Sequence, residues 1–74
     1  MIEQEVVSSQ IKKVGYDEEK KELFVTFNTG KKYKYSNVDK ELFNDLIEAE
    51  SIGKFFGAVI KSFPHIHHYE LIED

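Results

Sequence analysis

Lysines and tyrosines alternate in the segment Gly30–Val38, which reads GKKYKYSNV. Aromatic rings can stack on the bases of a single-stranded nucleic acid while lysine side chains contact its phosphates. Tyr33 and Tyr35 are two residues apart, and residues at that spacing share one face of a β-strand. Lys32 and Lys34 share the opposite face. Which of the two sets can reach a ligand depends on which face of the sheet the rest of the chain covers.

The hairpin that contains this segment indicates which face is covered. Glu22–Phe27 (ELFVTF) alternates in polarity, and the following Asn28–Gly30 (NTG) predicts a three-residue loop with glycine in the left-handed conformation. In that register Val25 pairs with Tyr33, and a slip by one residue would mix the apolar and polar sets. The apolar set, which we expect in the core beneath the helices, is Leu23, Val25, Phe27, Tyr33 and Tyr35.

The lysines are therefore expected on the open face of the sheet, around an aromatic ring. Phe24 would lie there with Lys32 and Lys34, and Lys12 or Lys13 would approach from the neighbouring strand. A ring among lysines suits a single-stranded nucleic acid. Two other interpretations stay open. The lysines are solvated and protect the sheet from aggregation, or the C-terminal residues or a second copy of the chain cover the ring.

A second candidate anion site is Ser51–Lys54 (SIGK), where Ser51 is expected to cap a helix. Backbone N–H groups at a helix N-terminus attract anions, and a bound phosphate would offset the unfavourable interaction of Lys54 with the helix dipole. The alternative is that Glu48 or Glu50 balances the charge and that Gly53 serves close packing.

The histidines His65, His67 and His68 have a spacing that could chelate zinc or nickel. The chain contains no cysteine, and no acidic residue is clearly placed to complete such a site, so a flexible, partly exposed tail is the favoured interpretation. Its contacts would then depend on pH around 6 to 7. Ser8 and Ser9 have no recognisable base or acid partner, so we expect a protein without catalytic residues, metal or cofactor.

The composition limits the class of protein. The 74 residues carry a formal charge of −4, and all ten cations are lysines, which argues against a general nucleic-acid binder but leaves room for a local basic patch. No apolar run reaches the roughly 18 residues of a membrane span, and the N-terminal residues do not resemble a signal peptide. We therefore expect a soluble, cytoplasmic protein.

The chemistry-bearing residues must be positioned by a small α+β domain. Three strands are predicted, at 10–16, 22–27 and 31–35, followed by two helices. Ser36 or Asn37 is the expected cap of the first helix, and the apolar stripe of the second runs from Ile52 to Phe63, before Pro64. The predicted fold is a three-stranded antiparallel β-meander followed by two helices packed on one sheet face (β-β-β-α-α). It is one domain, 1–74, with a core at about 6–63 and a C-terminal tail at 64–74.

Three segments resemble the KTSC domain family: Ser8–Asp17 (SSQIKKVGYD), Leu23–Tyr35 (LFVTFNTGKKYKY) and Leu46–Phe56 (LIEAESIGKFF). The family's central Tyr-x-Tyr corresponds to Tyr33-Lys34-Tyr35, and the resemblance covers roughly Val6 to Phe63. Asp39 stands where the family often has proline, and Gly57 where it often has asparagine. The family is named for the C-terminus of some lysyl-tRNA synthetases, which implies RNA as a partner.

The sequence thus predicts a small non-catalytic binding module that contacts RNA, either tRNA-like or single-stranded. The residues predicted to bind are Lys12, Lys13, Phe24, Lys32, Lys34 and Lys54. The alternative is a module for protein interaction or self-association that uses Phe24 and the C-terminal tail.

Overall fold

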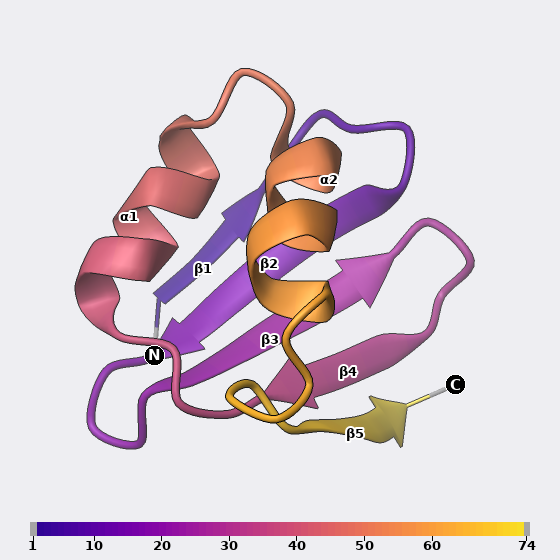
Figure 1. Cartoon of the computed structure of the whole chain (residues 1–74). Helices are drawn as coiled ribbons and strands as arrows, with labels where there is room; N and C mark the ends of the chain where they lie inside the picture. The colour runs from indigo at the N-terminus through magenta and orange to yellow at the C-terminus, as the bar shows by residue number, and fades with distance from the viewer. Residues whose placement is uncertain (1, 74) are drawn as a thin grey trace.

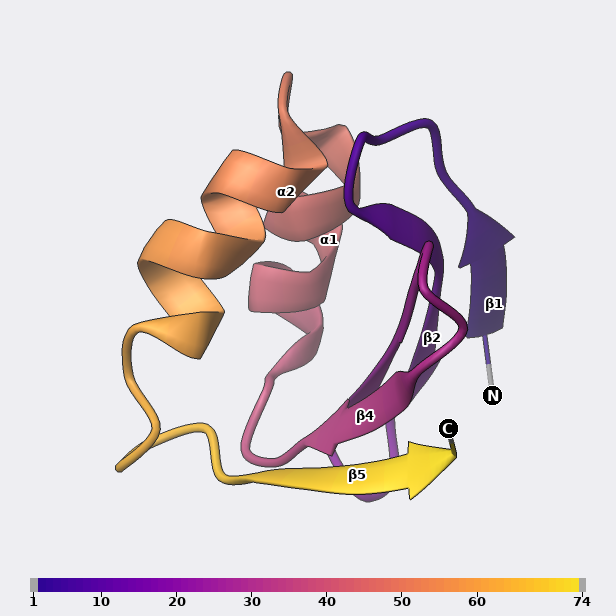
Figure 2. The same ribbon diagram turned by 90° about the vertical axis from the view of Figure 1, so that its right-hand side faces the viewer.

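The computed structural model describes residues 2–73, so Met1 and Asp74, the two ends of the predicted domain, lie outside the described residues. These residues form an antiparallel sheet with its strands in chain order (Figure 1). The helices lie together on one side of the sheet (Figure 2). The strands are β1 (Ile2–Glu5), β2 (Ile11–Asp17), β3 (Glu22–Phe27), β4 (Lys32–Tyr35) and β5 (Tyr69–Glu73). The helical segments are α1 (Lys40–Glu48), α2 (Ile52–Phe55) and a wide π-helical turn, η1 (Phe56–Lys61), that continues α2.

The central hairpin has the predicted register. Val25 lies opposite Tyr33, and Leu23 lies opposite Tyr35. The Phe27 N–H donates a 2.9 Å hydrogen bond to the Lys31 carbonyl, which closes the three-residue loop. Gly30 has a φ of 98°, the left-handed conformation expected for glycine at this position.

The prediction of a three-stranded meander is wrong in the number of strands, although the α+β class is confirmed. Among the described residues the sheet has five strands, because β1 pairs with β2 and β5 pairs with β4. All four residues of β1 are exposed, and Tyr69 and Leu71 of β5 are 62% and 47% exposed. Such exposed edge strands form through backbone hydrogen bonds to a neighbouring strand. Because they bury few side chains, their sequences show little hydrophobic alternation.

The core lies between the helices and the central strands. The ring of Tyr16 in β2 stacks on Phe43 of α1 with centroids 4.7 Å apart, and its hydroxyl donates a 2.7 Å hydrogen bond to the Val38 carbonyl. Phe56, which opens η1, has its ring centroid 5.0 Å from that of Tyr35 in β4. These aromatic pairs attach both helices to the sheet. The buried apolar side chains are Ile11, Val14, Tyr16, Leu23, Val25, Tyr35, Val38, Phe43, Leu46, Ile52, Phe56 and Ile60.

The first helix is capped by a residue other than those predicted. Asp39, rather than Ser36 or Asn37, is the N-cap, and its Oδ1 accepts a 2.8 Å hydrogen bond from the Leu42 N–H. Ser36 and Asn37 precede this N-cap in the chain, and Asn37 has a positive φ of 61°, so neither residue occupies the capping position. Ser51 caps α2 as predicted, because its Oγ accepts from the Lys54 N–H at 3.4 Å.

We expect Asp39→Ala to lower the free energy of unfolding by about 1 kcal/mol, because the substitution leaves the Leu42 N–H without its partner. Urea denaturation followed by circular dichroism measures this change. Ser36→Ala is the control, since Ser36 bonds through its backbone, and it should change stability by less than about 0.5 kcal/mol. A larger loss for Ser36→Ala than for Asp39→Ala would return the cap to the residue predicted from the sequence.

The second helix ends earlier than predicted. The sequence carries its apolar stripe to Phe63, but the last helical residue is Lys61, and Phe63 is 49% exposed. A π-helical turn contains more residues than an α-helical turn, so it shifts the phase of the stripe. Ile60 therefore closes the core, and Phe63 lies outside it.

Candidate nucleic-acid interface

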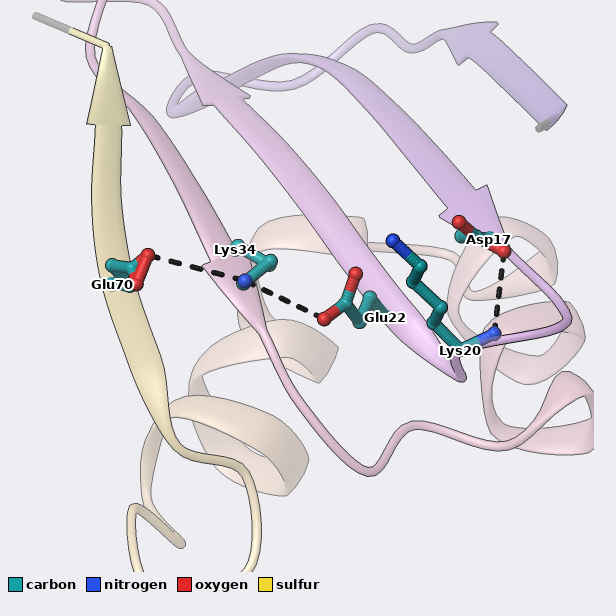
Figure 3. A network of polar contacts seen from close by, with 5 residues as sticks. All are labelled: Asp17, Lys20, Glu22, Lys34 and Glu70. Atoms are coloured by element: carbon teal, nitrogen blue, oxygen red, sulfur yellow. Dashed lines mark hydrogen bonds and ion pairs between the residues drawn. The ribbon is translucent and has the colours of Figure 1, made fainter.

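The open face of the sheet carries four of the predicted binding residues, but carboxylates accompany its lysines. Lys13 Nζ lies 3.5 Å from Glu3, and Lys34 Nζ lies 3.4 Å from Glu22 and 3.9 Å from Glu70. Figure 3 shows Lys34 between these last two carboxylates, which come from the neighbouring strands on either side. The remaining lysine, Lys32, places its Nζ 5.7 Å from the centroid of the half-buried Phe24 ring.

The strand register makes this face acidic. Cross-strand partners point to the same side of a sheet, so the residues on the open face follow from the pairing. Three lysines, Lys13, Lys32 and Lys34, share it with carboxylates that outnumber them: Glu3, Glu5, Asp17, Glu22 and Glu70. A phosphate approaching this face meets a surplus of negative charge, so the geometry does not favour nucleic acid here.

The other two predicted lysines lie away from this cluster. Lys12 is exposed and occupies the irregularity of β2, where the pairing skips from Ile11 to Lys13. Lys54 is exposed on α2, on the helical side of the molecule. The structure therefore does not join the six residues into one surface.

Gly53 beside Lys54 serves close packing. A Cβ atom at Gly53 would lie 3.3 Å from Ser8 Oγ, a tight contact. That hydroxyl also accepts from the Gln10 N–H at 3.2 Å, so the loop before β2 that lies beside Gly53 is itself hydrogen-bonded. The packing interpretation of this segment is thus the one that the geometry supports, and α2 itself is only four residues long.

The two central tyrosines differ in their surroundings. Tyr35 is 4% exposed and lies in the core, as predicted. Burial raises the pKa of its hydroxyl to about 12, with smaller contributions from Tyr33 and Tyr69, so the ring is neutral at physiological pH. Tyr33 is only half-buried and lines a groove on the helical side of the sheet.

This aromatic groove, of about 790 Å³, lies where the end of η1, the β3–β4 loop and β5 meet. Its rings are in mutual contact: the centroid of Tyr33 is 5.8 Å from that of Phe27 and 6.1 Å from that of Tyr69. Tyr69 also lies 6.0 Å from Tyr35. The lining residues are Ser9, Gln10, Phe27, Asn28, Thr29, Lys31, Tyr33, Tyr35, Lys61, Pro64 and Tyr69.

The charge of the aromatic groove is positive. Lys31 and Lys61 are its charged lining residues, and no carboxylate side chain that the structure describes lines it. Both lysines are exposed, and neither forms an ion pair with a described side chain. The groove therefore combines aromatic rings with two lysines that have no described ion-pair partner, within a chain of net charge −4. This combination is complementary to an aromatic anion.

Among the aromatic and cationic residues of this groove, sequence reasoning missed four: Phe27 as a lining residue, Lys31, Lys61 and Tyr69. A weak signal for Tyr69 exists, because Tyr69 and Leu71 alternate with polar residues as in a short strand. Nothing in the spacing of Lys61 distinguishes it from the other exposed lysines. Only the packing of η1 above the sheet brings it to the tyrosines.

The predicted partial exposure of the C-terminal histidines is confirmed for two of them, but the segment leads into a paired strand. His67 is 7% exposed, and its Nδ1 lies 3.2 Å from the Ser36 carbonyl oxygen, while β5 follows directly. His65 and His68 are exposed. Residues 2–73 contain no group of three histidine or acidic side chains placed to hold a metal ion. None of the helices in this part of the chain is long and apolar enough to cross a membrane.

Comparison with known proteins identifies the architecture. The family model described as the KTSC domain matches residues 7–63, which is most of the chain. The chain belongs to the KTSC domain family. A crystal structure of a KTSC domain protein from Yersinia pestis has a TM-score of 0.87 to this KTSC domain at 31% identity, and 96% of each chain is covered.

Two curated relatives of this KTSC domain share 41% identity with it. One, from Tsukamurella paurometabola, aligns over 58 residues that cover 78% of this chain and 87% of the relative. The other, an uncharacterized protein from Stutzerimonas stutzeri, aligns over 54 residues that cover 73% and 76%. None of these names states a ligand or a reaction. The matched region ends at residue 63, so Pro64 and Tyr69 of the aromatic groove lie beyond it.

Proposed function

We propose that this KTSC domain is a non-catalytic module that binds RNA through the aromatic groove. The observation that carries the proposal is the meeting of Tyr33, Tyr69 and two lysines in one groove of about 790 Å³. Tyrosine rings offer stacking surfaces for bases, and lysines contact phosphates. The resemblance to a domain named for lysyl-tRNA synthetases supports the same class of partner.

The groove is a better candidate than the open sheet face that the sequence suggested. Lys13 and Lys34 on the open face are paired with carboxylates, and an incoming phosphate would have to compete with these partners. Lys31 and Lys61 have no such described partner. Phe24 is half-buried beneath Lys32, whereas Tyr69 is 62% exposed. An exposed aromatic ring and lysines without a described ion-pair partner therefore occur together in the groove but not on the open face.

Two charge-matched double variants test the proposal, by titration of isotope-labelled protein with tRNA and with a single-stranded RNA of ten nucleotides. Lys31→Gln with Lys61→Gln should weaken binding about tenfold. It should also lower the slope of log affinity against log salt by roughly 1.4, because each lysine on a single strand accounts for about 0.7. Lys32→Gln with Lys34→Gln, which removes the same charge from the open face, should have a much smaller effect.

If Lys32→Gln with Lys34→Gln weakened RNA binding more than Lys31→Gln with Lys61→Gln, the site would lie on the open face. No binding of either RNA by the unaltered protein would reject RNA as the partner. The exposed Leu71 and Ile72 on the edge strand β5 would then favour the alternative of a protein partner or self-association.

A further inference from the structure

We infer that the aromatic groove receives an unpaired segment of about two nucleotides, with one base stacked on Tyr69. This inference rests on the proposed function and specifies its ligand. The volume of about 790 Å³ lies within the range of roughly 300–1,000 Å³ that accommodates small ligands. A pair of nucleotides is of that size, whereas a longer strand would have to continue outside the groove.

Tyr69 has the properties of a stacking residue. The residue is 62% exposed, yet its ring contacts those of Tyr33 and Tyr35, at centroid distances of 6.1 and 6.0 Å. Its backbone is paired with that of Tyr35 in the β4–β5 ladder. A ring held in place by a strand and two other rings loses little side-chain entropy when a base stacks on it.

The cations come from two different layers of the fold. Lys61 is the last residue of η1 in the helical layer, and Lys31 precedes β4 in the hairpin loop of the sheet. A base on Tyr69 would have its phosphates within a groove whose described charges are these two ammonium groups. The aromatic groove is thus complementary to a short anionic chain that carries aromatic groups, and an oligonucleotide has this chemistry.

Stacking on Tyr69 requires a base whose face is not already covered by neighbouring bases. In a duplex the base faces are stacked on their neighbours, and the regular helix is recognised mainly through its sugars and phosphates. The groove should therefore select unpaired RNA. Because every base has an aromatic face, we expect little preference among sequences.

The C-terminal strand is what completes this site. The region matched by the family model ends at residue 63, and Tyr69 is delivered by β5. β5 is held by its ladder with β4 and by the hydrogen bond from the Ser36 N–H to the His68 carbonyl, 2.8 Å long. The stacking surface thus belongs to a segment outside the matched region.

The test uses the full chain and three RNAs: the dinucleotide UpU, a single strand of ten uridines, and a blunt duplex of ten base pairs. We expect UpU to shift the resonances of Tyr33, Lys61 and Tyr69, and the single strand to bind at least tenfold more tightly than the duplex. Tyr69→Ala should weaken binding of UpU and of the single strand about tenfold. Tyr69→Phe, which keeps the ring, should bind as the unaltered protein does.

Several results would overturn the inference. In one such result, the single strand binds in a way that depends on Lys31 and Lys61, but UpU shifts no resonance of the groove. That result would leave the proposed function intact and reject the two-nucleotide site. Equal affinities of the unaltered protein for the duplex and the single strand would reject selection for unpaired bases. Tyr69→Ala with unchanged affinity would remove Tyr69 from the site. Absence of binding by all three RNAs would reject both the inference and the proposed function.

Discussion

Phe56→Ala is expected to lower the free energy of unfolding by about 3–5 kcal/mol, the usual cost of removing a buried phenylalanine ring. Phe56 is 2% exposed, and its ring lies 5.0 Å from that of Tyr35 and 5.8 Å from that of Phe27. The substitution would leave a cavity between η1 and the sheet. A domain of 74 residues has a total stability of roughly 4–11 kcal/mol, so the variant would keep only part of it.

Urea denaturation of both proteins, followed by circular dichroism, measures this loss as a lower midpoint at an unchanged slope. Phe63→Ala is the matched control, because the same ring is removed from a residue that is 49% exposed just beyond the helix. We expect the control to cost less than about 1 kcal/mol. Equal losses for the two variants would mean that Phe63, as the apolar stripe predicted, belongs to the core.

Alkaline pH is expected to destabilise the domain through Tyr35. Burial raises the pKa of its hydroxyl from 10.0 to about 12 in the folded protein. Below pH 10 the phenol is neutral in both states, and its contribution to stability is fully present. Between pH 10 and 12 the unfolded chain releases this proton while the folded protein keeps it, so stability falls as pH rises. The loss amounts to about 2–3 kcal/mol by pH 12.

Tyr35→Phe isolates this contribution from the other groups that titrate at high pH. The free energy of unfolding is measured by urea denaturation at intervals from pH 8 to 12 for both proteins. The unaltered protein should lose more stability than the variant over this range, and the difference should grow above pH 10. Burial, followed by Asp39 and Glu18, also raises the pKa of Tyr16, and this effect remains in the variant. Parallel stability curves would show that Tyr35 is more hydrated than its 4% exposure indicates.

The functional inferences depend on how carboxylates are distributed. The sequence places Lys32 and Lys34 on the open face and shows their separation from the tyrosines. It does not show that Glu70, from 36 positions further along the chain, approaches Lys34 to within 3.9 Å. Three of the five acids on the open face, Glu3, Glu5 and Glu70, come from strands β1 and β5, which the hydrophobic pattern does not reveal. The missing strand β5, which carries Tyr69, is one reason why the sequence does not predict the groove.

The sequence by itself determined the parts of this protein that depend on local alternation and spacing. The β3–β4 register, the left-handed Gly30, the Ser51 cap and the separation of lysines from tyrosines all follow from residues close together in the chain. The KTSC family was also recognisable, because its segments occur in order at the right spacing.

The tertiary structure decided the number of strands, the true cap of α1 and the location of the aromatic groove. Edge strands form through backbone hydrogen bonds to a distant partner, which hydrophobic periodicity does not encode. Lys31, Lys61 and Tyr69 are separated by up to 38 positions in the sequence, and only the packing of η1 and β5 around the hairpin brings them together. A site assembled from three such elements exists only once the chain has folded.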